Sequence, residues 1–242
     1  MAEKIEQQLP EDAAAIVAKA KGFWAKFSKR IILIGSAVIV LGTAWFAYKY
    51  FYKLPKNEKA EQQIFPAEKL FDVMSSSTGF NKDSINFVLN GDKAQNITGL
   101  LKIIDNFSGT PAANRASLMV GTCYLNLKDF DKAIKHLKAF DGEGADQIAA
   151  KAYKLLGDAY AEKKNTSDAF SSYKKAANVL SDKDEAQKAY HLWVAANYAD
   201  YIGNTKEAIE ICKDLKTNFP LTNPVSSFEV DKLLAKLGVV NF

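Results

Sequence analysis

The sequence predicts an all-α protein, in which one N-terminal transmembrane helix precedes an α-solenoid of three to four helical hairpins with a C-terminal capping helix. Three observations predict this architecture: an uncharged run of eighteen residues near the N-terminus, a helical pattern that repeats after thirty-six residues, and few segments that alternate like a strand. The 242 residues suffice for one domain of roughly 150–200 residues and an appendage.

The chain divides into four predicted parts. Residues 1–28 form a basic amphipathic segment, 29–52 the transmembrane helix, 53–61 a juxtamembrane linker and 62–242 the repeat domain. The net charge is +4, and five basic residues fall within 19–30 without any acid among them. The rest of the chain is therefore nearly neutral and lacks the basic stripe of a domain that binds nucleic acid.

The transmembrane helix rests on the uncharged run from Ile31 to Tyr48. At 1.5 Å per residue this run reaches about 27 Å, close to the hydrocarbon thickness of a bilayer. Aromatic residues gather at both of its ends, as they do at membrane interfaces. A cleaved signal peptide is disfavoured, because a long segment precedes the run and no small-residue cleavage site follows it. Gly35 and Gly42 share one helix face, which packs against another membrane helix or faces lipid.

The segment before the span is predicted to be an amphipathic helix. Its apolar residues Ile16, Ala20, Phe23 and Phe27 recur at helical spacing among the lysines. Such a helix lies on an anionic membrane surface or docks on a partner. Five basic residues before the span and four after it favour a cytoplasmic N-terminus by a narrow margin.

Two stretches of the remaining chain match each other at a spacing of thirty-six residues. Their sequences are LMVGTCYLNLKDFDKAIKHL and KLLGDAYAEKKNTSDAFSSY. In a helical hairpin, Gly121 and Gly157 let the two helices approach closely, and Ala133 and Ala169 do the same from the second helix. The pattern resembles that of tetratricopeptide repeats, which are helix–turn–helix units.

Further units are more divergent. A third unit starts at about Gln187, carries Ala196 at the small position and ends at Pro220, which cannot continue a helix. An apolar pattern over 227–237 predicts a last helix, which we expect to cap the open end of the solenoid.

A weak first unit precedes the clear repeats. Its two helices are predicted at 62–74 and 97–107. The insert between them, 75–95, is rich in Ser, Asn, Gly and Asp, so we expect a loop there.

Nothing in the sequence predicts catalysis, a cofactor or a metal. His136 and His191 are the only histidines, and their spacing makes no metal site. No phosphate-binding loop or nucleophile motif occurs. Cys123 and Cys212 stand among apolar residues of predicted helices, so we expect two buried thiols. The domain is therefore expected to bind proteins, and neither nucleic acid nor a small-molecule substrate.

The layout as a whole resembles the bacterial single-span tetratricopeptide-repeat proteins of the YfgM type, ancillary subunits of the Sec translocon. The shared features are Phe23-Trp24 and the basic residues before the span, the span itself, a weak first repeat, the Gly-Thr-Pro turn at 109–111 and the two clear repeats. The resemblance implies a single-pass protein of the bacterial inner membrane, with a cytoplasmic N-terminus and a periplasmic domain. It also implies partners: SecYEG translocon subunits, a membrane-anchored periplasmic chaperone and unfolded clients as they emerge.

The resemblance further implies a partner-binding groove, lined by the first helix of each repeat along one face at i, i+3, i+4 and i+7. The residues on that face are Arg115, Leu118, Thr122, Asn126, Lys151, Lys154, Asp158, Glu162, Tyr190, Trp193, Asn197 and Tyr201. Trp193 and Tyr201 are either anchors for a partner, since large aromatic residues dominate binding hot spots, or packing residues against the cap helix.

Two other functions stay open. The protein could be a scaffold of another envelope complex, for outer-membrane assembly or cell-wall synthesis. It could also be a cytosol-facing receptor that docks chaperones, which usually needs several Lys, Arg and Asn residues as a carboxylate clamp. Lys151, Lys154 and Asn197 fit such a clamp, whereas Asp158 and Glu162 oppose it.

Overall fold

The structure is a computed structural model that describes residues 11–239. It confirms the predicted helical architecture, with one short β-hairpin in addition. The chain separates into two compact units, one up to Lys56 and one from Asn57 onward. Each unit is described by itself.

The first unit is built on one long helix, α1 (Glu11–Tyr48), followed by a π-helical turn at Lys49–Lys53. Among the described residues, this is the one helix long and apolar enough to cross a membrane, and its apolar stretch is not buried within the protein. Ser36 and Thr43 donate their hydroxyl protons to the carbonyls of Leu33 and Ile39, both at 2.9 Å. These two polar side chains in the apolar run are thus satisfied by hydrogen bonds within the helix.

The second unit begins with helices that the sequence pattern describes less well. Its first elements are α2 (Leu54–Val73), α3 (Lys82–Asn90), the antiparallel strands β1 (Gly91–Asp92) and β2 (Ile97–Thr98), and α4 (Leu100–Asn106). Residues 54–61 of the predicted linker are helical, and Ala60 is fully buried.

The predicted loop at 75–95 is wrong, because this stretch contains α3. Asn81 caps that helix by accepting a hydrogen bond from the backbone N–H of Ser84 at 2.8 Å. Ile85, Val88 and Leu89 are buried at the helical spacing i, i+3, i+4. Because the flanking residues are polar, the sequence pattern of this short apolar face did not indicate a helix.

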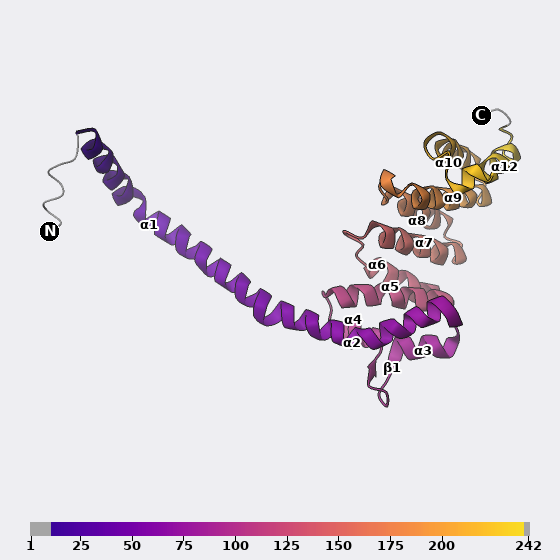
Figure 1. The fold of residues 1–242 in the computed structure, drawn as a ribbon, viewed down its shortest axis with the longest axis horizontal. Helices are drawn as coiled ribbons and strands as arrows, with labels where there is room; N and C mark the ends of the chain where they lie inside the picture. The colour runs from indigo at the N-terminus through magenta and orange to yellow at the C-terminus, as the bar shows by residue number, and fades with distance from the viewer. Residues whose placement is uncertain (1–10, 240–242) are drawn as a thin grey trace. The chain divides into compact units, whose positions relative to one another are not determined.

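Three helical hairpins follow, and Figure 1 shows them stacked in chain order. They are α5 (Pro111–Asn126) with α6 (Phe130–Ala139), α7 (Asp146–Glu162) with α8 (Thr166–Asn178), and α9 (Glu185–Tyr201) with α10 (Thr205–Asn218). Each hairpin packs on the next, which confirms the repeat seen in the sequence.

The same turn joins the two helices of all three hairpins. Lys128, Lys164 and Gly203 adopt positive φ values of 61°, 58° and 76° after the first helix. The next residue is Asp129, Asn165 or Asn204, whose side chain caps the second helix by accepting a backbone N–H three residues on. Repeats whose sequences differ therefore keep one local geometry.

Glycine allows the close approach of the paired helices, as predicted. A Cβ atom on Gly121 would lie 2.6 Å from Cγ of Leu137, and one on Gly157 would lie 2.6 Å from Cε1 of Tyr173. Both contacts are shorter than real Cβ contacts, so a larger residue at either site must displace its neighbour.

Two buried clusters make up the core of the second unit. One runs from α2 to α5, and the other includes the cap, α11 (Asn223–Ser226) and α12 (Glu229–Lys236). Val230, Leu233 and Leu234 of α12 join the second cluster, so the capping helix is confirmed. Cys123 and Cys212 are fully buried, which confirms the expectation of two buried thiols, and burial raises the pKa of each thiol to about 12.

Candidate protein-binding surface

An open, largely aromatic depression of about 420 Å³ lies along α9. We call it the α9 patch, and its lining residues are Tyr173, Tyr190, Trp193, Val194, Asn197, Tyr198 and Tyr201. Six of these come from α9 at spacings of three and four residues, which places them on one face of the helix. The seventh, Tyr173, is supplied by the neighbouring helix α8.

The α9 patch includes two exposed tyrosine side chains. Tyr201 is 82% exposed and Tyr190 is 50% exposed, while Trp193 and Tyr198 are partly buried against the second core cluster. The ring centroids of Tyr173 and Tyr198 are 4.9 Å apart, and those of Tyr198 and Tyr201 are 5.9 Å apart. These contacts make the aromatic rings of the patch contiguous, so the patch is a candidate surface for contact with another molecule.

Hydrogen bonds hold the floor of the patch in place. The Tyr173 hydroxyl donates to Asp158 at 2.9 Å, and Lys154 donates to the other carboxylate oxygen of Asp158 at 2.8 Å. Burial, together with the adjacent Asp158 carboxylate, raises the pKa of Tyr173. Tyr173 therefore stays neutral, and its ring is held in place at the floor of the patch.

The structure brings four of the predicted groove residues together in the patch: Tyr190, Trp193, Asn197 and Tyr201. Lys154 and Asp158 lie beneath it through Tyr173. Sequence reasoning missed Tyr173, Val194 and Tyr198. The first comes from α8, so the periodicity of α9 carries no signal for it, whereas the helical spacing of the other two from Tyr190 was an available signal.

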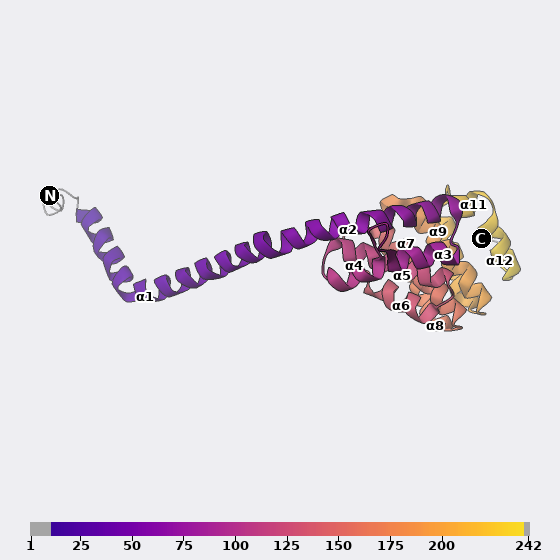
Figure 2. The same ribbon diagram turned by 90° about the horizontal axis from the view of Figure 1, so that it is seen from below.

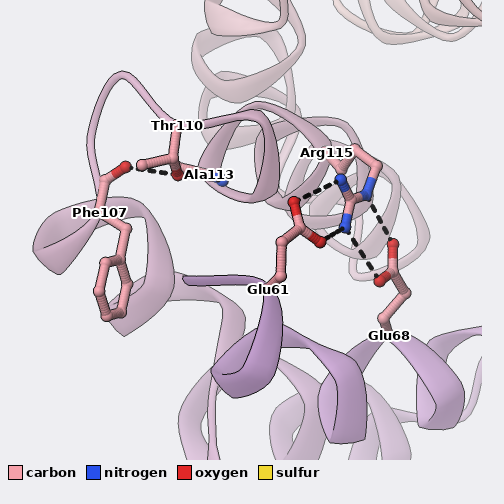
Figure 3. A network of polar contacts seen from close by, with 6 residues as sticks. All are labelled: Glu61, Glu68, Phe107, Thr110, Ala113 and Arg115. Carbon is pink, nitrogen blue, oxygen red and sulfur yellow. Dashed lines mark hydrogen bonds and ion pairs between the residues drawn. The ribbon is translucent and has the colours of Figure 1, made fainter. Parts of the chain in front are cut away.

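Arg115 lies elsewhere, on α5, where it binds two acids of α2 (Figure 3). Its guanidinium donates to Glu61 at 2.7 and 3.1 Å and to Glu68 at 2.9 and 3.3 Å. These bonds raise the pKa of Arg115, and the bond from Arg115 lowers the pKa of Glu61. Thr110 caps the same helix by accepting the Ala113 N–H at 3.2 Å, also visible in Figure 3.

The remaining predicted groove residues do not line the α9 patch. Leu118 packs against the second core cluster, and Thr122 and Asn126 each hydrogen-bond a carbonyl one turn earlier in α5. Lys151 is exposed on α7. Contact of these residues with a partner stays a prediction.

Loss of the Arg115 clamp should loosen α2 without unfolding the later hairpins. The Arg115→Met variant leaves Glu61 and Glu68 without their cation, and we expect a loss of about 1 kcal/mol because the three side chains are partly exposed. Hydrogen exchange should accelerate in α2 while protection in α7–α10 is unchanged.

The matched control is Lys132→Met, which removes an exposed ion pair with Asp129 inside one helix turn. That variant should leave exchange in α2 as it is. Equal protection of α2 in Arg115→Met and the wild type would show that the ion pairs do not hold this helix.

His191 introduces a pH dependence beside the patch. It is buried on α9, and its Nδ1 has no hydrogen-bond partner among the described residues. Burial, and then the charge of Lys154, lower the pKa of His191, and burial also lowers that of His136. In the unfolded chain the histidines bind a proton near their ordinary pKa of about 6.5, whereas in the folded chain they bind it only at a lower pH. Stability is therefore lost as the pH falls below about 6.5.

We therefore expect the free energy of unfolding to fall as the pH is lowered through about 6.5, by up to roughly 1.4 kcal/mol per pH unit for each histidine. Denaturant unfolding followed by circular dichroism measures this dependence. The His191→Gln variant, which cannot titrate, should have a shallower slope. A slope identical to that of the wild type would mean that His191 is not the group that titrates.

Comparison with known proteins identifies a family to which this chain is similar. The family described as tetratricopeptide repeat-like domain matches residues 21–155, more than half of the chain. The match starts in the basic part of α1 and ends within α7. No curated protein matches the sequence. A domain of this family is typically a non-enzymatic scaffold for protein–protein interaction.

Proposed function

This chain belongs to the tetratricopeptide repeat-like domain family, and on that premise we propose that it is a membrane-anchored module that holds a partner protein on its α9 patch. The single observation that carries the proposal is the exposure of Tyr190 and Tyr201 beside Trp193 in one depression. Tyrosine and tryptophan bury large areas at a small cost in side-chain entropy, which makes them common anchors of interfaces.

The anchor in this proposal is the apolar stretch of α1. Its side chains are exposed rather than buried against the rest of the chain, so a bilayer is the environment that would satisfy them. Trp45, Tyr48 and Tyr52 at one end, with Lys49 beside them, have the composition of a membrane interface. Lys49 lies 5.1 Å from the Trp45 ring centroid, within the range of a cation–π contact.

The more specific form of the proposal is an accessory subunit of the Sec translocon in the bacterial inner membrane. In that role the protein links the translocon to periplasmic chaperones and to secretory proteins as they emerge. The support for this role is the resemblance to the YfgM-type proteins in the basic segment, the span and the clear repeats. The family match over residues 21–155 covers part of the basic segment, the span and the first clear repeat.

The test is to purify the tagged full chain from membranes in mild detergent, with and without prior crosslinking, and to identify what accompanies it. The proposal predicts translocon subunits and a membrane-tethered chaperone, and their loss in the Tyr201→Ala variant. Recovery of a different envelope complex would overturn the Sec role while leaving the binding module intact. Recovery of the same proteins with the Tyr201→Ala variant would overturn the role of the patch.

Topology is tested separately with cysteines, because both native thiols are buried. Ser171→Cys on α8 and Ala25→Cys on α1 introduce exposed thiols in the two units. A membrane-impermeant maleimide applied to cells with a permeabilised outer membrane should label position 171 and spare position 25. The reverse pattern would place the repeat domain in the cytosol.

A further inference from the structure

The N-terminal half of α1 extends well beyond what a membrane span needs. The helix has 38 residues, and its uncharged run starts only at Ile31. The preceding turns, residues 11–30, measure about 30 Å at 1.5 Å per residue. Figure 2 shows that the first turns of α1 run in a different direction from the rest of the helix.

These turns carry an apolar face that nothing within the first unit covers among the described residues. At 100° per residue, Ile16, Phe23, Trp24 and Phe27 fall within a sector of about 100°. Ile16 is 67% exposed, Phe23 58% and Trp24 55%. The rings of Phe23 and Phe27 are in contact, with centroids 4.9 Å apart, so the face is contiguous. Left in water, it would be a costly apolar surface.

From residue 13 to residue 30 the charges on this helix have one sign. On the same helical wheel, Lys19, Lys26 and Arg30 border one side of the apolar sector, and Lys21 stands toward the other side. No acid occurs from residue 13 to residue 57. Lys26 lies 5.5 Å from the Phe27 ring centroid, so a cationic group stands at the boundary between the apolar and polar faces. Lysine at such a boundary can reach up to headgroups while its stem stays among apolar groups.

We propose that residues 13–30 form an in-plane helix that binds the anionic surface of the membrane. The apolar sector enters the boundary between headgroups and acyl chains, and the basic residues bind lipid phosphates. Direct continuity with Ile31 keeps the segment at the surface of whichever bilayer holds the span. The inference goes beyond the binding of a partner protein and does not depend on it.

Charge favours lipid over a protein groove as the occupant. Over residues 13–30 the apolar sector is flanked by cations and no acid occurs, which matches a uniformly anionic surface. A protein groove would instead bury the aromatic residues and leave them insensitive to lipid charge. The lipid charge is therefore the variable that distinguishes the two occupants.

The experiment uses the full chain in vesicles of phosphatidylcholine, with or without about one third phosphatidylglycerol. An environment-sensitive fluorophore is attached to one introduced cysteine, which is selective because Cys123 and Cys212 are buried. Ala20→Cys places the probe in the apolar sector, and Ala25→Cys places it on the opposite side of the same helix. Val38→Cys, within the apolar run, verifies in every vesicle that the span has inserted.

In anionic vesicles the fluorescence emission of the probe at position 20 should be blue-shifted and should be quenched by brominated lipid. The emission of the probe at position 25 should show neither effect. Replacing Lys19, Lys26 and Arg30 with glutamine should lower the docked-to-undocked ratio by roughly a hundredfold, at about fivefold per basic residue. High salt should act in the same direction. Equal signals from the probes at positions 20 and 25 would overturn the proposal. It would also be overturned if the probe at position 38 reports insertion but the signal at position 20 does not change with lipid charge or with the three substitutions.

Discussion

The Gly157→Val variant should lose about 3 kcal/mol of unfolding free energy, a large share of the stability of a small domain. Even the Cβ atom of the new side chain would lie 2.6–2.7 Å from the ring of Tyr173. Tyr173 cannot easily yield, because it is buried, its hydroxyl is bound to Asp158 and its ring contacts Tyr198. Valine also gains little in helix propensity over glycine that would offset the clash.

Denaturant unfolding of the detergent-solubilised chain measures this loss, and Tyr173→Leu provides the matched partner substitution. Tyr173→Leu alone should also destabilise, because it removes a buried ring and the hydrogen bond to Asp158. In the double variant the smaller leucine leaves room for valine. The loss of unfolding free energy in the double variant should therefore be smaller than the sum of the two single-variant losses by more than 1 kcal/mol. Simple additivity would show that the glycine is not there to accommodate the ring.

The second large effect is expected on binding. Trp193→Ala should weaken the affinity for the partner by about thirtyfold or more, and Tyr201→Ala by a similar order, because buried aromatic anchors contribute about 2 kcal/mol or more at hot spots. Tyr201 is the cleaner test: its side chain is 82% exposed, so truncation costs the fold little. Calorimetry or surface capture with the purified partner measures the change.

Leu221→Ala is the control for this prediction. Leu221 is 90% exposed, yet it does not line the α9 patch. The control should bind as the wild type does and should have the same circular dichroism spectrum as Tyr201→Ala. If both variants bind with equal affinity, exposure of aromatic surface on α9 has no role in recognition.

The regular part of the fold could be predicted from the sequence because its signals are local. Gly121 and Gly157, with the alanines of the second helices, mark the close approach of paired helices wherever they occur. The helix α3 was missed because its three buried residues are fewer than the polar residues around them. A short amphipathic element of this kind depends on the core that receives it.

The candidate site could be predicted only where it lies on one helix. The face of α9 follows from helical periodicity, so Tyr190, Trp193, Asn197 and Tyr201 were identified together. The environment of Arg115 could not be predicted in this way, because Glu61 is 54 residues away in the sequence. Tyr173 similarly enters the α9 patch from another helix, and only the packing of α8 against α9 places it there.

Photocrosslinking in membranes tests the central claim most directly. A photoreactive amino acid at position 201 of the full chain, with position 221 as the control, reports which proteins lie within contact distance of each site in the cell. We predict a covalent adduct with a defined protein from position 201 and none from position 221. Adducts from position 221 alone, or equally from both, would contradict the claim that the α9 patch is the surface that holds the partner.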